Sequence, residues 1–156
     1  MKLKAYILVL LVSIAPMALA FAQTAQEPIS RGENIPRLGD IMLAKQWRHI
    51  KLWFAGKQQN WNLAAYELAQ LRASLVDAAT LYSNVPVNDV ITMVGPIESL
   101  NKAIEIKDGA RFTRAFNELT AGCNACHREM RRDFIEIKIP AESPFSNQTF
   151  VPPTKR

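Results

Sequence analysis

Cysteine is scarce in this chain of 156 residues, which holds only Cys123 and Cys126. A disulfide between two residues so close in sequence would close a small strained loop and would restrain little of the remaining chain. This spacing excludes a fold held together by disulfides. It favours instead a chemical use of the two thiols.

Strand patterns, internal repeats and low-complexity tracts are also lacking, and most of the nine prolines lie near the two ends of the chain. The middle is therefore free for long regular elements. Hydrophobic residues make up 49% of the sequence and charged residues 21%, as in an ordinary folded protein. The length suits one domain.

The N-terminus has the pattern of an export signal. Lys2 and Lys4 precede an apolar run at residues 5–15, and small residues follow up to Ala22. The run is short for a bilayer span, which needs about 20 residues. We expect a signal peptide at residues 1–22 that is cleaved, periplasmic localisation in a bacterium, and no stable membrane insertion afterwards.

The charge balance does not indicate a nucleic-acid partner. Cleavage after residue 22 removes two of the 19 basic residues and none of the 14 acidic ones, which leaves a net charge of +3. This surplus is small and predicts at most a mild preference for acidic protein surfaces.

Apolar residues recur at helical spacing in four stretches after a loose leader at residues 23–36. We expect helices over 37–55, from 61 to about 82, over 87–104 and from 108 to 134. Gly95-Pro96 should kink the third helix.

Residues that cap helices lie at the expected ends of these stretches. Gly56 suits the position just past the first helix, while Asn60 and Asp108 suit the N-caps of the second and fourth. The short links predict an all-α, antiparallel up-down-up-down four-helix bundle over residues 37–137. The proline-rich residues 138–156 are expected to form a C-terminal extension that wraps the bundle or stays mobile.

The sequence Cys123-Asn124-Ala125-Cys126-His127 is the pattern of c-type haem attachment. Each thiol can add to one haem vinyl group, and the histidine that follows supplies a nitrogen to the iron. On a helix these three side chains fall on one face, because they lie three and four residues apart. Phe112 and Phe116 mark the same face as core. The pattern predicts one covalent haem c, with His127 as the proximal ligand.

Three other uses of the cysteine pair compete with haem attachment. A thiol–disulfide redox site usually follows a strand and opens a helix, and that context is missing. Half of a zinc site would need a further ligand of clear spacing, which the sequence does not offer. The cysteines could also be inert core residues. The export signal favours haem, because covalent attachment takes place outside the bacterial cytoplasm.

Only 29 residues follow His127, so the motif lies near the end of the last predicted helix. In this the chain resembles the class II cytochromes c, the four-helix bundles similar to cytochrome c′. The resemblance covers residues 37–135, and it implies a haem-side role for Arg131, the basic residue four after the histidine. In the first helix, Arg37 or Arg48 could take the family's other haem-side basic position. The long C-terminal tail departs from the family.

The distal side of the iron decides the function, and three alternatives stand. His49 would give bis-histidine iron, and Met42 would give methionine ligation; they lie seven residues apart on one face of the first helix. An iron facing Leu52 instead would stay open to NO or CO. Because the only other histidine is the proximal ligand, His49 is slightly favoured.

Other side chains that could serve the haem also have simpler explanations. Trp47, Trp53 and Trp61 fit helix packing better than haem contact. The remaining arginines near the motif could bind propionates or partners, or simply face solvent; they are Arg111, Arg114, Arg128 and Arg132.

No paired acid and base groups indicate an independent enzyme. We therefore expect an electron carrier that meets redox partner proteins and could form a homodimer. A gas-binding haem protein is the alternative, and a CxxC thiol–disulfide oxidoreductase is a further one.

Overall fold

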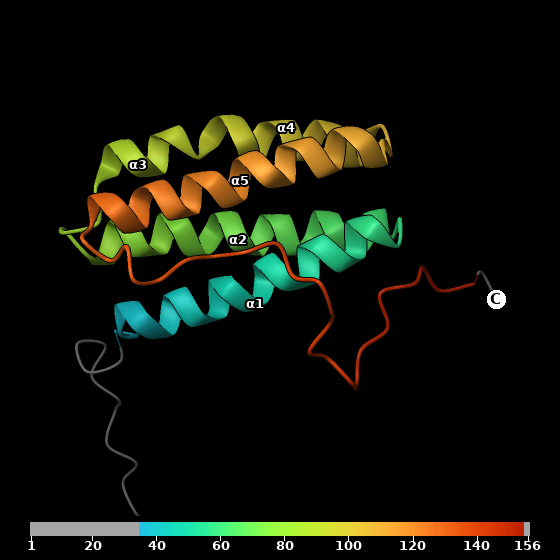
Figure 1. The fold of residues 1–156 in the computed structure, drawn as a ribbon, viewed down its shortest axis with the longest axis horizontal. Coiled ribbons are helices and arrows are strands. Elements are labelled where there is room, and N and C mark those ends of the chain that lie inside the picture. The colour runs from blue at the N-terminus through green and yellow to red at the C-terminus, as the bar shows by residue number, and fades with distance from the viewer. Residues whose placement is uncertain (1–34, 155–156) are drawn as a thin grey trace, which may run out of the picture.

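A computed structural model describes residues 35–154, and every regular element in that range is an α-helix. The fold class is therefore all-α, as predicted. The predicted signal peptide and nearly all of the leader lie outside the described residues. The helices are α1 (Leu38–Lys57), α2 (Trp61–Leu81), α3 (Val87–Thr92), α4 (Val94–Glu105) and α5 (Gly109–Glu129). They lie side by side as a bundle in which α3 and α4 follow each other along one rod (Figure 1).

The predicted kink in the third helix is a complete break. α3 ends at Thr92, and α4 begins at Val94 after the single residue Met93. Proline lacks the backbone N–H, and its ring collides with the carbonyl four residues before it, which for Pro96 belongs to Thr92. The break therefore comes a few residues before the proline itself.

Three helices end in the same way, with a residue of positive φ that is not glycine. After α1, α4 and α5 these residues are Gln59, Lys107 and Arg131, with φ of 57°, 58° and 54°. In each case the backbone N–H groups of this residue and the next reach back to carbonyls in the last turn, the pattern of a Schellman motif.

These ends correct two predicted boundaries. α1 runs on to Lys57, so Gly56 lies inside the helix and not just past it. α5 stops at Glu129, and the chain turns away before Phe134, which is 74% exposed. Phe134 therefore does not continue the apolar face of the last helix, as its spacing had suggested. The turn at Arg131 was hidden because no glycine marks it.

The core lies between the helices and is built around two aromatic side chains of α5. Phe112 and Phe116 are completely buried, and their rings stack 5.9 Å apart. Leucines at 52, 71 and 100 bring α1, α2 and α4 into the same cluster. Gly56 permits this packing because a Cβ there would overlap the ring of Phe112. The missing side chain at Gly56 thus lets α5 approach α1 closely at Phe112.

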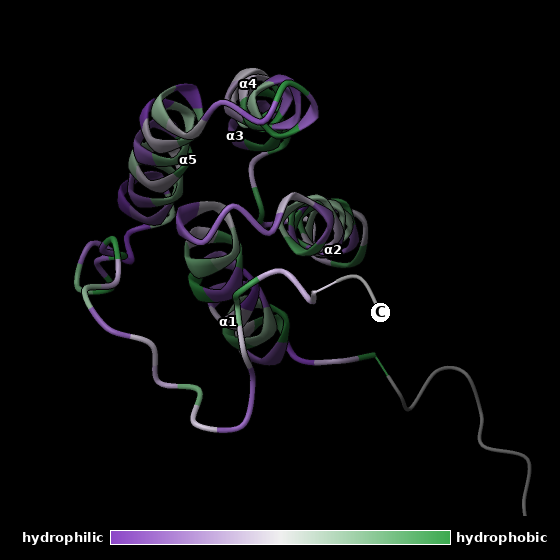
Figure 2. Ribbon diagram, turned by 90° about the vertical axis from the view of Figure 1, so that its right-hand side faces the viewer, coloured by the Kyte–Doolittle hydropathy of each residue, from purple (hydrophilic) through white to green (hydrophobic). Residues whose placement is uncertain are grey.

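Residues 130–154 form no helix, and they return along the bundle instead of extending from it. Figures 1 and 2 show this C-terminal segment leaving the end of α5 and passing along α1. The ring of Phe145 packs edge-on against Trp47 at 5.2 Å, and Phe150 is buried against Phe54 at 5.7 Å. These two rings place the segment in contact with α1.

Candidate functional site

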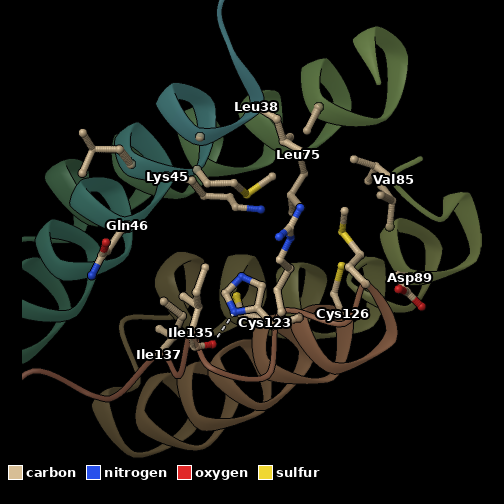
Figure 3. A pocket seen from close by; sticks show the side chains of 18 of the residues that line it. Leu38, Lys45, Gln46, Leu75, Val85, Asp89, Cys123, Cys126, Ile135 and Ile137 are labelled. Atoms are coloured by element: carbon tan, nitrogen blue, oxygen red, sulfur yellow. Dashed lines mark hydrogen bonds between the residues drawn. The ribbon is translucent and has the colours of Figure 1, made fainter. Parts of the chain in front are cut away.

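A cavity of about 540 Å³ opens at the end of the bundle where α5 finishes. Cys123, Cys126 and His127 all line it, and so do residues of α1, α2, α3 and the C-terminal segment (Figure 3). The volume lies in the range of small-molecule and cofactor sites, about 300–1,000 Å³. Most of the wall is apolar, as Leu38, Met42, Leu75, Val85, Val90 and Ile135 illustrate.

α5 brings the three motif side chains together because it remains regular to the end of the motif. Asp108 caps its first turn, since Oδ1 accepts from the N–H groups of Ala110 and Arg111 at 2.9 Å each. Residues 123–127 therefore lie on a helix, as the sequence predicted. The face that carries Phe112 and Phe116 in the core continues into the cavity as the face of the two thiols.

Both cysteines are free thiols in an environment that keeps them protonated. Burial raises the pKa of Cys123. Burial first, and then the carboxylate of Asp89, raise the pKa of Cys126 to about 11. Reactive redox cysteines have a lowered pKa and sit near helix N-termini or cations. This pair lies at the other end of its helix, and burial outweighs the opposing effect of the nearby Lys45, so the pKa of each thiol is raised.

The Asp89 carboxylate contributes an unusual feature to the cavity wall. Its Oδ2 is buried and, among the described residues, has no hydrogen-bond partner. Buried polar atoms are nearly always paired, so this oxygen is an exception, and the same carboxylate lies close enough to the Cys126 thiol to raise its pKa.

His127 is held in the tautomer that a metal ligand needs. Its Nδ1 lies 2.8 Å from the carbonyl oxygen of Ile135. A carbonyl can only accept, so Nδ1 carries a proton, and in the neutral ring Nε2 then keeps its lone pair. Metal-bound histidines usually have this arrangement, with the second nitrogen donating to a carbonyl or carboxylate.

Of the two distal candidates, Met42 lines the cavity and His49 lies beyond it. Met42 belongs to the same wall as Lys45, on the side of α1 that faces the motif. His49 does not line this cavity; it lines a smaller crevice that Cys123 and His127 share, and it is itself 3% exposed.

A hydrogen-bond chain fixes His49 in the core. The Thr120 hydroxyl donates to the carbonyl of Phe116 at 2.8 Å, so it accepts from Nε2 of His49 at 2.9 Å. That nitrogen therefore carries a proton and has no free lone pair. Burial lowers the pKa of His49 to about 4, which keeps the ring neutral.

Two cations reach the cavity wall: Lys45, which was not singled out from the sequence, and Arg132, one of the arginines considered there for the propionates. Lys45 lines it from α1, where burial lowers its pKa, and Arg132 lines it from the C-terminal segment. Arg131 does not line it; it is the exposed turn residue after α5. Lys45 could have been found from its spacing, because it lies three residues after Met42 on the same helix face. The sequence did not separate Arg132 from the other arginines near the motif, because its place depends on the turn at Arg131.

The two arginines considered for α1 are engaged elsewhere. Arg37 pairs with Asp40 on the surface at 3.0 Å. Arg48 pairs at 3.0 Å with the buried carboxylate of Glu67 on α2. Neither lines the cavity.

The tryptophans serve packing, as the sequence favoured. Trp53 and Trp61 pack on the core next to Phe112, and Trp47 lies on Phe145 of the C-terminal segment. None of the three is part of the cavity wall.

Two further observations concern residues 35–154 as a whole. None of their helices combines the length and apolar character that a bilayer crossing requires. No three of their His, Cys, Asp or Glu side chains converge as a site for a bare metal ion.

Comparison with known proteins gives no match to this chain, whether with protein families, with curated proteins or with solved structures. The resemblance to class II cytochromes therefore rests on the attachment motif, its position in the last helix and the helical pattern alone.

Proposed function

We propose that this protein is an exported monohaem c-type cytochrome that carries single electrons between redox partner proteins in the periplasm. One observation carries the proposal: both thiols and a histidine in the ligand tautomer line a single, mostly apolar cavity of cofactor size. We further infer that the four rods form the antiparallel up-down-up-down bundle of class II cytochromes. The short links, such as residues 58–60 and 106–108, support that topology.

The residues present fit a haem. Cys123 and Cys126 would each add S–H across a vinyl double bond, so that sulfur bonds to one carbon and the proton goes to the other. No electron is gained or lost in this addition. Nε2 of His127 would hold the iron, and Lys45 and Arg132 offer positive charge for the two propionates. Haem supplies an iron that changes its charge by one electron.

We assign the distal position to Met42. His49 would first have to give up its hydrogen bond to Thr120 and leave the core. Two other methionines line the cavity but are less suitable. Met93 packs its sulfur against the backbone of α5 at Gly122, and Met130 follows His127 by only three residues at the end of the same helix. A thioether on iron would favour electron transfer over gas binding.

The residues around the site would keep water from it and set the electrostatics of the iron. Leu75, Val85 and Val90 belong to the apolar wall of the cavity. Where such a wall excludes water, electrostatic interactions between charges in the site are stronger. A cation such as Lys45 favours the reduced state, whereas the Asp89 carboxylate favours the oxidised state. The protein itself thus tunes the potential, while the cofactor carries the electron.

The test is expression of the full chain with the haem-attachment machinery of a bacterial periplasm. We expect haem staining that survives denaturing electrophoresis, and loss of that stain in the double variant C123S/C126S. A wild-type protein without covalent haem under these conditions would overturn the proposal.

Absorption spectra test the distal assignment. We expect a low-spin reduced spectrum that CO does not change, and a high-spin, CO-binding spectrum in M42L. M93L and H49Q are the matched controls. M93L alters another methionine that lines the cavity, and H49Q alters the other candidate for the distal position. A wild-type spectrum that shifts with CO would favour the gas-binding alternative instead, and loss of the low-spin spectrum in H49Q would favour bis-histidine iron.

A further inference from the structure

Asn124, the first residue between the two cysteines, forms a two-point contact with the C-terminal segment. Its Nδ2 donates to the carbonyl of Ile137 at 2.9 Å, and its Oδ1 accepts the N–H of the same residue at 2.8 Å. The side-chain amide thus pairs with one residue's backbone as a neighbouring strand would. Both polar groups of the Asn124 amide are therefore used in this contact, which a residue that only filled space between the cysteines would not require.

This contact lies next to the one that orients His127. Ile135, whose carbonyl accepts from Nδ1 of His127, is two residues before Ile137. Along α5, Asn124 and His127 are three residues apart, about 4.5 Å along the axis. Two residues of extended chain span about 6.6 Å, which is enough to reach from one of these side chains to the other. The segment therefore runs antiparallel to α5 and meets both side chains on one face of the helix.

Asn124 is the main polar anchor of this stretch. Among the described residues, no other hydrogen bond joins residues 136–144 to the helices. On the other side of Ile135, its N–H donates to the carbonyl of Arg132 at 2.8 Å, and the N–H of Arg132 donates to the carbonyl of His127 at 2.7 Å. Without Asn124, residues 136–144 would lose their hydrogen bonds to the helices, which would loosen the carbonyl of Ile135 and let water compete for Nδ1 of His127.

We infer that Asn124 is a positioning residue for the iron ligand: by holding Ile137, it keeps the carbonyl of Ile135 on Nδ1 of His127. This inference rests on the proposed function. A hydrogen bond from Nδ1 to a fixed carbonyl raises the basicity of the ligating nitrogen, which favours oxidised iron. The spacer residue of the attachment motif would thus set both the orientation of the ligand and the reduction potential.

The test compares N124A with N117A, a matched control on α5 whose exposed side chain bonds only to the carbonyl of Thr113. In the haem-loaded full chain, we expect a more positive midpoint potential for N124A and no shift for N117A. We also expect a changed Nδ1–H resonance of His127 by NMR in N124A alone. Equal potentials for N124A and the wild type would overturn the inference.

A second measurement does not depend on haem. In the apoprotein, we expect the amide of Ile137 to exchange about tenfold faster in N124A than in the wild type or N117A. Unchanged exchange would overturn the anchoring role even if the potential moved. Faster exchange in a chain that never takes up haem would instead overturn the proposed function, and would leave Asn124 as an anchor of the segment alone.

Discussion

At the scale of single residues, His49 is the more deeply buried of the two histidines. Its ring is buried beside Phe116, with centroids 4.5 Å apart, and its one polar contact is neutral Thr120. Burial lowers its pKa from 6.5 to about 4, because a charged ring would lose its hydration without gaining a partner.

This residue should make stability depend on pH in a defined window. Between pH 6.5 and 4 the unfolded imidazole binds a proton and the folded one does not. The free energy of unfolding should therefore fall as the pH drops through that window, by up to about 3 kcal/mol, and level off below it. Denaturant unfolding of the wild type and H49Q at a series of pH values measures this.

Glutamine at this position keeps a donor for Thr120 but cannot titrate in this range, and both proteins retain His127. The difference between their two profiles therefore isolates His49. Parallel profiles would show that His49 does not stay neutral and buried in the folded protein.

The sequence alone was enough to place a residue where its position follows from the spacing within one helix. The spacing of Cys123, Cys126 and His127 is enough to place them on one helical face. The sequence could not decide between Met42 and His49 as distal candidates, because both lie on one face of α1. What distinguishes them is tertiary packing, in which His49 is hydrogen-bonded to Thr120. Lys45 and Asp89 were missed for a related reason, since nothing in a single charged residue tells that it faces a cavity.

At the scale of elements, the contact between α1 and α5 depends on one small residue. Gly56 is buried in the last turn of α1, directly against the ring of Phe112. Phe112 is completely buried and also packs on Trp53 and Trp61, so it has no room to move aside.

We expect G56A to destabilise the protein by about 1–3 kcal/mol, because the added methyl overpacks the core. G39A is the matched control: Gly39 lies in the first turn of the same helix with nothing near its missing Cβ. Alanine there should stabilise slightly through helix propensity. Thermal and denaturant unfolding measure both, and equal effects of the two substitutions would contradict the packing role of Gly56.

Helix positions and the N-caps Asn60 and Asp108 followed from the sequence, but the end of the last helix did not. Prediction of an end relies on glycine at the left-handed position, and here Gln59, Lys107 and Arg131 occupy it. The same absence made the last helix look longer than α5. That error matters for the site, because the turn at Arg131 is what directs Arg132 and Ile135 toward the cavity.

At the scale of the whole molecule, the site is complete only when the C-terminal segment lies on the bundle. The segment supplies part of the cavity wall and the carbonyl that orients His127. Its sequence has no periodic pattern, so its path could not be predicted. The path depends on distant contacts, among them the bond from Asn60 Nδ2 to the carbonyl of Val151 at 3.4 Å.

Phe150 is the apolar anchor of this segment, since it is 7% exposed and belongs to the main core cluster. We expect F150A to cost about 3 kcal/mol in the free energy of unfolding, as for other buried phenylalanines. F134A, at a side chain of the same segment that is 74% exposed, should change stability little. If the segment folds together with the helices, F150A should lower the midpoint of one cooperative denaturant transition. A separate early transition for the segment, or equal stabilities of F150A and F134A, would instead show an appendage that does not share the core of the bundle.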